Sequence, residues 1–437
     1  MTIYLYKSKY GKARKTQLEI LKKFFQDWNT AQPMVICFHG GLIEESKALD
    51  LAARLEFEFG NAHTLFFIWN SNPVVILKDL VQRAAGFLET DEAKAVLKSV
   101  SRGAKKKGVK EKLSSVRLRK QANGVLWRRE PYKSDLKKVA SELPAIPKIF
   151  EEELFKARLS SGVTRRKKSS FLKKQGFFGN LKDGVESLFM LFHVLRRKRP
   201  GSGDDRALRA VIVEEVLRAL WVDKIGGLVW NGIKEQIRES FKAGGAGTAF
   251  LKALKVYCKI NPSPKRIILV GHSAGTIYAA HMIAAANKIL PPECKFEVVF
   301  LASACTFKTF EKLVLKNQAR VKKDGIWFFG LQGKTEKSDA LMKGNNVLEF
   351  LYPHSLLYFV SGVLGKDSNE PLIGMELFFK NSKHNKGSVK KVRDFVKPKY
   401  RYWSPIDKKV TAKDHANFIE DTALLASIRK IIDTGAC

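Results

Sequence analysis

The chain has 437 residues, of which 45% are hydrophobic, 79 are Lys or Arg and 43 are Asp or Glu, giving a formal net charge of +36. This apolar content excludes global disorder, and the length exceeds what one core of ordinary size needs, so we expect a core domain with a large insertion or a second domain. The five cysteines are widely spaced and form no C-x-x-C pair, so neither a zinc site nor a disulfide framework is indicated.

The N-terminal segment predicts neither secretion nor membrane insertion. Residues 1–15 lack the apolar core of a signal peptide. The uncharged stretch at residues 267–287 has Gly, His and Ser at its centre, which a membrane span disfavours. Together with the cysteine pattern, these observations predict a cytoplasmic protein and leave peripheral contact with the inner face of the membrane open.

Two apolar runs near the start of the chain predict buried strands. The first, "MVICFHGG" at residues 34–41, ends in a pair of glycines, and the second is "HTLFFIWNS" at residues 63–71. Between them, residues 44–59 place apolar side chains at helical spacing. This strand–helix–strand order favours a parallel sheet.

The segment from residue 73 to residue 245 concentrates the positive charge. Residues 101–200 alone hold 28 Lys or Arg against 9 Asp or Glu. We predict that the segment is an inserted, mainly helical cap over the carboxyl edge of the sheet. A solvated basic surface would explain this charge, but so would an anionic partner. We rank anionic lipid ahead of nucleic acid, because aromatic residues interleave with lysines at residues 171–195.

The stretch "RIILVGHSAGTIYAAHMIAAANK" at residues 266–288 carries the most specific signal. Residues 267–270 predict a short buried strand and the Ala-rich residues after Ser273 predict a helix, so Gly-His-Ser-Ala-Gly occupies the turn between them. Gly271 and Gly275 would let the strand and helix approach closely around a strained serine. The amides at the helix start would face a developing oxyanion. This is the context of a G-x-S-x-G nucleophile elbow.

Beyond this turn strands and helices alternate again, which predicts an α/β fold with a mostly parallel central sheet flanked by helices. The predicted elements are strands at residues 296–304, 325–332 and 389–396 and helices at residues 307–315, 355–364 and 415–432. We divide the chain into a first part of the core at residues 1–72, the basic cap insertion at residues 73–245 and a second part of the core at residues 246–437.

Outside the insertion, the chain resembles the α/β-hydrolase family. The resemblance rests on "FHGG" at residues 38–41, "GHSAG" at residues 271–275 and His415 ahead of the terminal helix. In that family the nucleophile, the acid and the histidine follow one another along the chain. The resemblance implies a serine hydrolase that forms an acyl-enzyme and needs no metal or organic cofactor.

The nucleophile and the base implied by this resemblance are Ser273 and His415. Ser273 would attack an acyl carbonyl, and His415 would take up and return its proton. His354 and His384 also follow the nucleophile along the chain. The start of a helix explains His354 without chemistry, and chain order favours His415.

The acid of the triad would follow the strand at residues 325–332. Gly333, directly after this strand, has no side chain, whereas Glu336 and Asp339 lie three and six residues further on. Either carboxylate could fold back to orient the imidazole and stabilise its charged form. Asp407 is a weaker candidate because it precedes the histidine by only eight residues.

Backbone amides would form the oxyanion hole. One is the amide of Ala274, directly after the nucleophile, and the other belongs to Gly41 or Leu42 in the turn after the first strand. We interpret His39 and His272, which belong to these two motifs, as structural supports rather than bases.

These observations favour hydrolysis of a carboxylic ester, with a lipid substrate as the sharper form of the hypothesis because of the basic insertion. A serine peptidase is an alternative, because the same triad cleaves amides. A non-catalytic or nucleic-acid-associated protein on this scaffold is the alternative from another class, since a fold does not fix a function.

Overall fold

The computed structural model describes residues 4–8, 15–29, 31–41, 45–69, 197, 203–206, 210–211, 214, 226–260, 266–339, 354–365, 369–397 and 399–437. Within them, one seven-stranded sheet has the order β1-β3-β2-β4-β5-β6-β7, and every neighbouring pair is parallel. The strands are β1 (Tyr4–Ser8), β2 (Met34–Phe38), β3 (His63–Trp69), β4 (Ile267–His272), β5 (Phe296–Leu301), β6 (Val321–Leu331) and β7 (Tyr400–Ser404). The predicted α/β class with a parallel sheet is confirmed.

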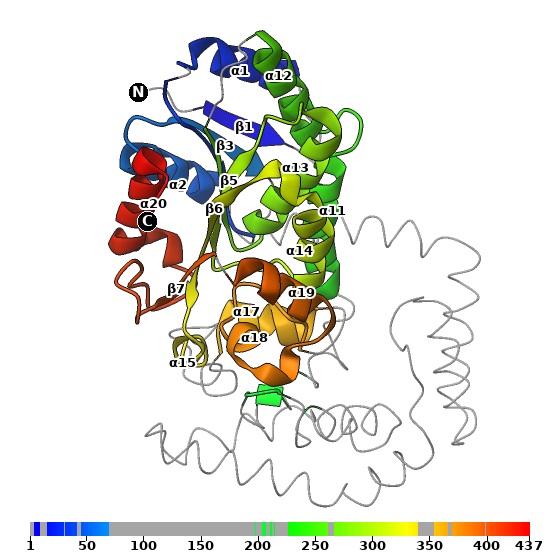
Figure 1. Ribbon diagram of the computed structural model, residues 1–437, viewed down its shortest axis with the longest axis vertical. Coiled ribbons are helices and arrows are strands. Elements are labelled where there is room, and N and C mark those ends of the chain that lie inside the picture. The colour runs from blue at the N-terminus through cyan, green and yellow to red at the C-terminus, as the bar shows by residue number, and fades with distance from the viewer. Residues whose placement is uncertain are drawn as a thin grey trace, which may run out of the picture.

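Helices cover both faces of the sheet (Figure 1). One face packs against α2 (Glu45–Glu58) and α20 (Thr422–Thr434). The opposite face packs against a larger set of helices, which comprises α1 (Lys15–Asp27), α11 (Gly226–Ser240), α12 (Ala246–Ile260), α13 (Gly275–Ile289), α14 (Phe307–Leu313) and α19 (Gly387–Val396).

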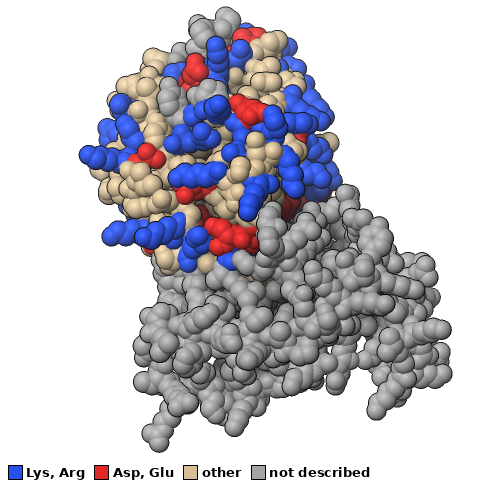
Figure 2. Space-filling model, turned by 60° about the horizontal axis from the view of Figure 1, so that its bottom comes forward, with Lys and Arg blue, Asp and Glu red and all other residues tan. Residues whose placement is uncertain are grey.

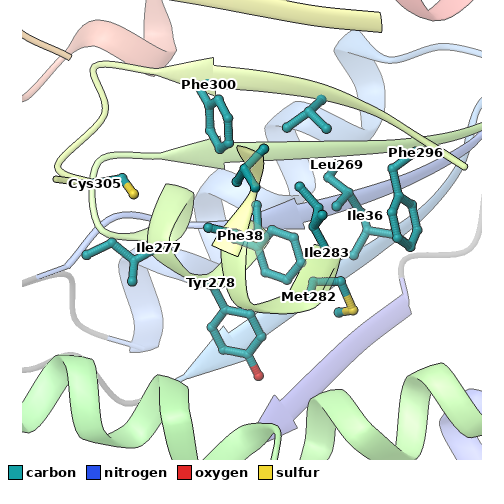
Figure 3. Packing of buried hydrophobic residues seen from close by; sticks show 14 of the residues in the cluster. Ile36, Phe38, Leu269, Ile277, Tyr278, Met282, Ile283, Phe296, Phe300 and Cys305 are labelled. Atoms are coloured by element: carbon teal, nitrogen blue, oxygen red, sulfur yellow. The ribbon is translucent and has the colours of Figure 1, made fainter. Parts of the chain in front are cut away.

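The strands are apolar at nearly every position because both of their faces are covered. On β2, Ile36 and Phe38 belong to the core under α13, whereas Val35 and Cys37 belong to the core under α2 and α20. Figure 3 shows side chains of α13, among them Tyr278, packed over β2, β4 and β5. This layer fixes the start of α13 against the end of β4.

The strand predicted at residues 389–396 is wrong, because this segment forms helix α19. Val389, Val392 and Val396 are buried at spacings of three and four residues, whereas Lys390 and Asp394 are exposed, and this is a helical period. The β-branched residues suggested a strand, but their spacing fits a helix. The last strand is instead β7.

The predicted start of the final helix at His415 is also wrong. Helix α20 begins at Thr422, where the carboxylate of Asp421 accepts a hydrogen bond from the Leu424 amide at 2.8 Å and caps the helix. His415 therefore lies in the loop between β7 and α20. Strand β1 and helix α1 were not predicted.

Most of the predicted cap at residues 73–245 lies outside the described residues, and its helical character stays a prediction. Of the described part, α11 packs against α13. A buried ion-pair cluster joins Arg197 to Asp204 at 2.8 Å and Arg206 to Glu214 at 3.1 Å. Arg206 also donates to the hydroxyl of Ser361 at 3.1 Å, which fixes this part of the segment to η4 (Val360–Leu364).

The described surface carries much of the positive charge. Lys and Arg side chains are spread over the face shown in Figure 2, with Asp and Glu in smaller groups between them. Among the described residues, no helix combines the length and the apolar character that crossing a bilayer requires.

Candidate active site

Ser273 occupies the turn between β4 and α13 with a φ of 50°, in the left-handed region that side chains rarely adopt. Such a conformation costs about 1–3 kcal/mol and persists only where the surrounding structure holds it in place. Here the Ser273 amide donates to the Leu301 carbonyl at 2.9 Å, and the Ser273 carbonyl accepts from the Thr276 hydroxyl at 2.6 Å and the Ala304 amide at 3.2 Å. These bonds tie the strained turn to β5 and its following loop.

The two glycines of the motif are required by the close approach of backbones. A Cβ at Gly275 would lie 2.2 Å from the Phe38 carbonyl oxygen, and one at Gly271 would lie 2.9 Å from the backbone of Gly275. No side chain fits at either position without displacing main chain. The strand, the turn and the helix predicted from the sequence are all present, with small residues on either side of Ser273.

His415 is brought to Ser273 across the carboxyl edge of the sheet. Its Nε2 lies 3.1 Å from Oγ of Ser273, and its side chain is buried. Burial lowers the pKa of His415 to about 4, against an opposing effect of the Asp414 charge. The imidazole is therefore neutral near pH 7, and with Nε2 as the acceptor it can take a proton from the serine hydroxyl.

Asp339 is also brought to His415, through the main chain. Its Oδ2 accepts a hydrogen bond from the His415 amide at 2.8 Å, and the residue is buried. Among the described residues, the buried Nδ1 of His415 makes no hydrogen bond. The carboxylate of Asp339 is thus bound to the main chain of His415, and not to Nδ1, the position that the acid of a catalytic triad contacts.

Glu336 does not contact His415. It ends the one-turn helix α15 (Gly333–Glu336), and its Oε2 accepts a hydrogen bond from the Ser355 hydroxyl at 2.5 Å. The side chain is completely buried, and burial raises the pKa of Glu336 to about 8. The two acids proposed for one role are thus separated by a single turn of chain.

The other candidates make their contacts elsewhere. Nδ1 of His354 lies 3.1 Å from the Lys337 carbonyl oxygen, and Nε2 of His384 lies 2.9 Å from the Gly203 carbonyl oxygen. Asp407 accepts from the Trp403 amide at 2.6 Å within its own turn.

The turn after β2 lies directly against the elbow. A Cβ at Gly41 would be 3.2 Å from Cβ of Ala274, and one at Gly40 would be 3.5 Å from Cβ of Ser273. Among the hydrogen bonds of the described residues, none is donated by the Gly41 or Ala274 amide. Within the described ranges neither amide has an acceptor in the protein, which is a requirement for an oxyanion hole. Leu42, the alternative donor, lies outside the described residues.

His39 fixes this turn to the neighbouring strand. Its Nε2 accepts from the Trp69 amide at 3.2 Å, and its Nδ1 lies 2.7 Å from the Gly40 carbonyl oxygen. Burial lowers the pKa of His39 to about 4 and that of His272 to about 3. Both rings are neutral near pH 7, and both pack in the interior.

Several supporting residues were missed in the sequence. Trp69 holds His39, and the Ser303 hydroxyl donates to the Thr276 hydroxyl at 2.8 Å behind the elbow. Trp69 and Ser303 each lie at or just beyond the carboxyl end of a strand. This position in the sequence is the feature that could have marked them as residues near the site. The groups of His, Cys, Asp and Glu within the described ranges include none that could hold a metal ion.

Because the pKa of His415 is lowered, we predict that activity persists to an unusually low pH. We expect kcat/KM for ester hydrolysis to stay level from pH 7 to about pH 5 and then to fall with an apparent pKa near 4, because protonated His415 cannot accept the serine proton. A limb near 6.5, the ordinary value for histidine, would contradict this. Initial rates between about pH 4 and 8 provide the measurement.

Stability must be followed in the same experiment. Because the folded-state pKa values of His39 and His272 lie below the ordinary value, the fold favours their neutral forms. Stability is therefore full above about pH 6.5 and is lost as the pH falls toward the lowered values. Circular dichroism at each pH separates unfolding from titration of the base.

Comparison of this chain with protein-family models, with curated proteins and with solved structures gives no match.

Proposed function

We propose that this protein is a serine hydrolase of the α/β-hydrolase type that cleaves a carboxylic ester through an acyl-enzyme. The observation that carries the proposal is the pair of Ser273, at positive φ on a strand-to-helix turn, and His415, whose Nε2 lies 3.1 Å from the serine Oγ. The buried carboxylate of Asp339 and the free amides of Ala274 and Gly41 support it. A buried serine without chemistry needs no strained backbone.

In the first half of the proposed reaction, Oγ of Ser273 bonds to the ester carbonyl carbon while its proton passes to Nε2 of His415. The carbonyl oxygen becomes an oxyanion that accepts from the amides of Ala274 and Gly41. The charge of Asp339 stabilises the imidazolium. The bond from the carbonyl carbon to the leaving oxygen then breaks, the alcohol leaves with the proton from Nε2, and the acyl group stays on Oγ.

In the second half, His415 takes a proton from water, and the water oxygen bonds to the acyl carbon. The bond between Ser273 and the acyl group breaks, the serine recovers its proton from Nε2, and a carboxylic acid is released. Because the pKa of His415 is lowered, the imidazole is neutral at the start of each half.

The alternatives differ in what supports them. A peptidase would use the same groups, and no contact among the described residues favours an amide over an ester. The lipid substrate and the anionic membrane partner depend on the basic insertion, which lies mostly outside the described residues, and they stay predictions. A non-catalytic role leaves the pairing of Ser273 with His415 unexplained.

Covalent labelling tests this proposal. A fluorophosphonate probe is expected to modify wild-type protein at Ser273, because the activated Oγ displaces fluoride from phosphorus. The Ser273→Ala variant should remain unlabelled, and peptide mass spectrometry should place the adduct on residue 273. Equal labelling of both proteins, or no labelling of the folded wild type, would refute the proposed function.

A further inference from the structure

The loop that carries Asp339 is attached to the fold through Glu336. At its start, the Gly333 amide donates to Oε2 of Glu376 at 2.8 Å. At the end of α15, the Ser355 amide donates to the Glu336 carbonyl at 2.8 Å, while the Ser355 hydroxyl donates to the Glu336 side chain at 2.5 Å. Glu336 thus joins α15 to the N-terminus of α17 (Leu356–Phe359) by main chain and side chain together.

The surroundings of the Glu336 carboxyl favour its neutral form. The side chain is 0% exposed, and Oε1 has no hydrogen-bond partner among the described residues. A buried carboxylate oxygen without a donor is costly, whereas a protonated acid avoids most of that cost. Burial and the unpartnered oxygen therefore both favour the neutral acid.

Charged groups from two parts of the chain, and a tyrosine from a third, surround this carboxyl. Asp339 lies on the same loop, Asp205 and Arg206 come from the predicted insertion, and Tyr358 of α17 donates to Asp205 at 3.1 Å. Burial is the largest influence and raises the pKa of Glu336 to about 8. The Asp339 and Asp205 charges also raise it, while the Ser355 hydrogen bond and Arg206 lower it. The carboxyl is therefore neutral at pH 7 and ionises in mildly alkaline solution.

We propose that Glu336 is a positioning residue, which as a neutral acid bound to Ser355 holds the loop so that Asp339 meets His415, and which displaces Asp339 by charge repulsion when it loses its proton. This inference rests on the proposed hydrolase activity. Ionisation places a second negative charge in the interior close to Asp339, and two like charges there repel each other. Glu336 contacts neither Ser273 nor His415 among the described residues, so it acts on catalysis through Asp339.

The experiment compares kcat and KM of wild type, Glu336→Gln and Glu336→Ala for an activated ester between about pH 6 and 10. Wild type is expected to lose kcat above an apparent pKa near 8. Glu336→Gln, neutral at every pH, should stay within about threefold of wild type at pH 7 and lack this alkaline limb. Glu336→Ala should lower kcat about 10²-fold with little change in KM, because the loop loses its anchor.

Glu56→Gln is the matched control, because Glu56 is a buried carboxyl with a raised pKa on α2, which packs against β3 and α20. It should keep the alkaline limb. An unchanged limb in Glu336→Gln overturns the proposal, and this comparison remains decisive if Glu336→Ala does not fold. Labelling of Ser273 in each variant separates the two hypotheses: a labelled enzyme with an unchanged limb refutes only the role of Glu336, whereas an unlabelled wild type refutes the hydrolase itself.

Discussion

Replacing Ser273 by alanine is expected to lower kcat for ester hydrolysis by about 10⁶-fold, because the acyl-enzyme cannot form. His415→Ala should cost nearly as much, since the hydroxyl 3.1 Å from its Nε2 then has no base. The double variant should be no slower than the single variants, because the two groups act as one unit. Steady-state rates of the three variants and wild type provide the measurement.

Two matched substitutions control for loss of a buried serine or of another histidine. Ser427 on α20 is buried and donates to the Lys409 carbonyl at 2.8 Å, and Ser427→Ala should leave kcat within about threefold of wild type. His384→Ala tests the alternative base in the same way. Additive losses in the Ser273 and His415 double variant, or a large loss in His384→Ala, would contradict the assigned pair.

Asp339→Asn is expected to lower kcat by up to about 10⁴-fold while the protein stays folded. In the wild type the His415 amide donates to Oδ2 of Asp339 at 2.8 Å. The side-chain oxygen of an asparagine can accept the same hydrogen bond, so the geometry of the loop is largely kept. What is lost is the negative charge that stabilises the imidazolium formed in each half-reaction. The rate loss therefore reports on charge, and thermal unfolding of the variant checks that the fold is retained.

The same assay decides between the two carboxyls. Glu336→Gln should lose little activity at pH 7, whereas Asp339→Asn should lose nearly all of it. Asp407→Asn is the control, because the carboxylate of Asp407 accepts a hydrogen bond from the Trp403 amide within its own turn and makes no contact with His415 among the described residues. If Glu336→Gln were inactive and Asp339→Asn remained active, the acid of the triad would be Glu336 and not Asp339.

The sequence predicted the core of the fold where local pattern and tertiary environment agree. Strands β2 and β4 are buried on both faces, so they read as uninterrupted apolar runs, and the glycines beside Ser273 mark a turn that only small residues allow. The prediction of secondary structure was wrong where the residue types favoured one element and the spacing of the apolar residues favoured another. In α19 the β-branched Val389 and Val392 suggested a strand, although their burial follows a helix.

The acid could not be chosen from the sequence, because Glu336 and Asp339 lie three residues apart in one loop. The choice depends on α15, a single turn of helix that ends at Glu336 and directs its side chain to Ser355. So short a helix has no periodicity to detect. The partner Ser355 is distant in sequence, and only the packing of α17 brings it to the loop.

The position of β2 in the sheet has a consequence for biosynthesis. This strand pairs with β3, made shortly after it, and with β4, which follows only after the long inserted segment. At ribosomal speeds of about 5–20 residues per second, the nascent chain waits roughly ten to forty seconds before β4 emerges. During that interval one edge of β2 exposes unpaired amides and carbonyls beside apolar side chains, a ready template for pairing with other chains. The core is therefore completed late. The chain is most exposed to aggregation during synthesis, while only its N-terminal part has been made.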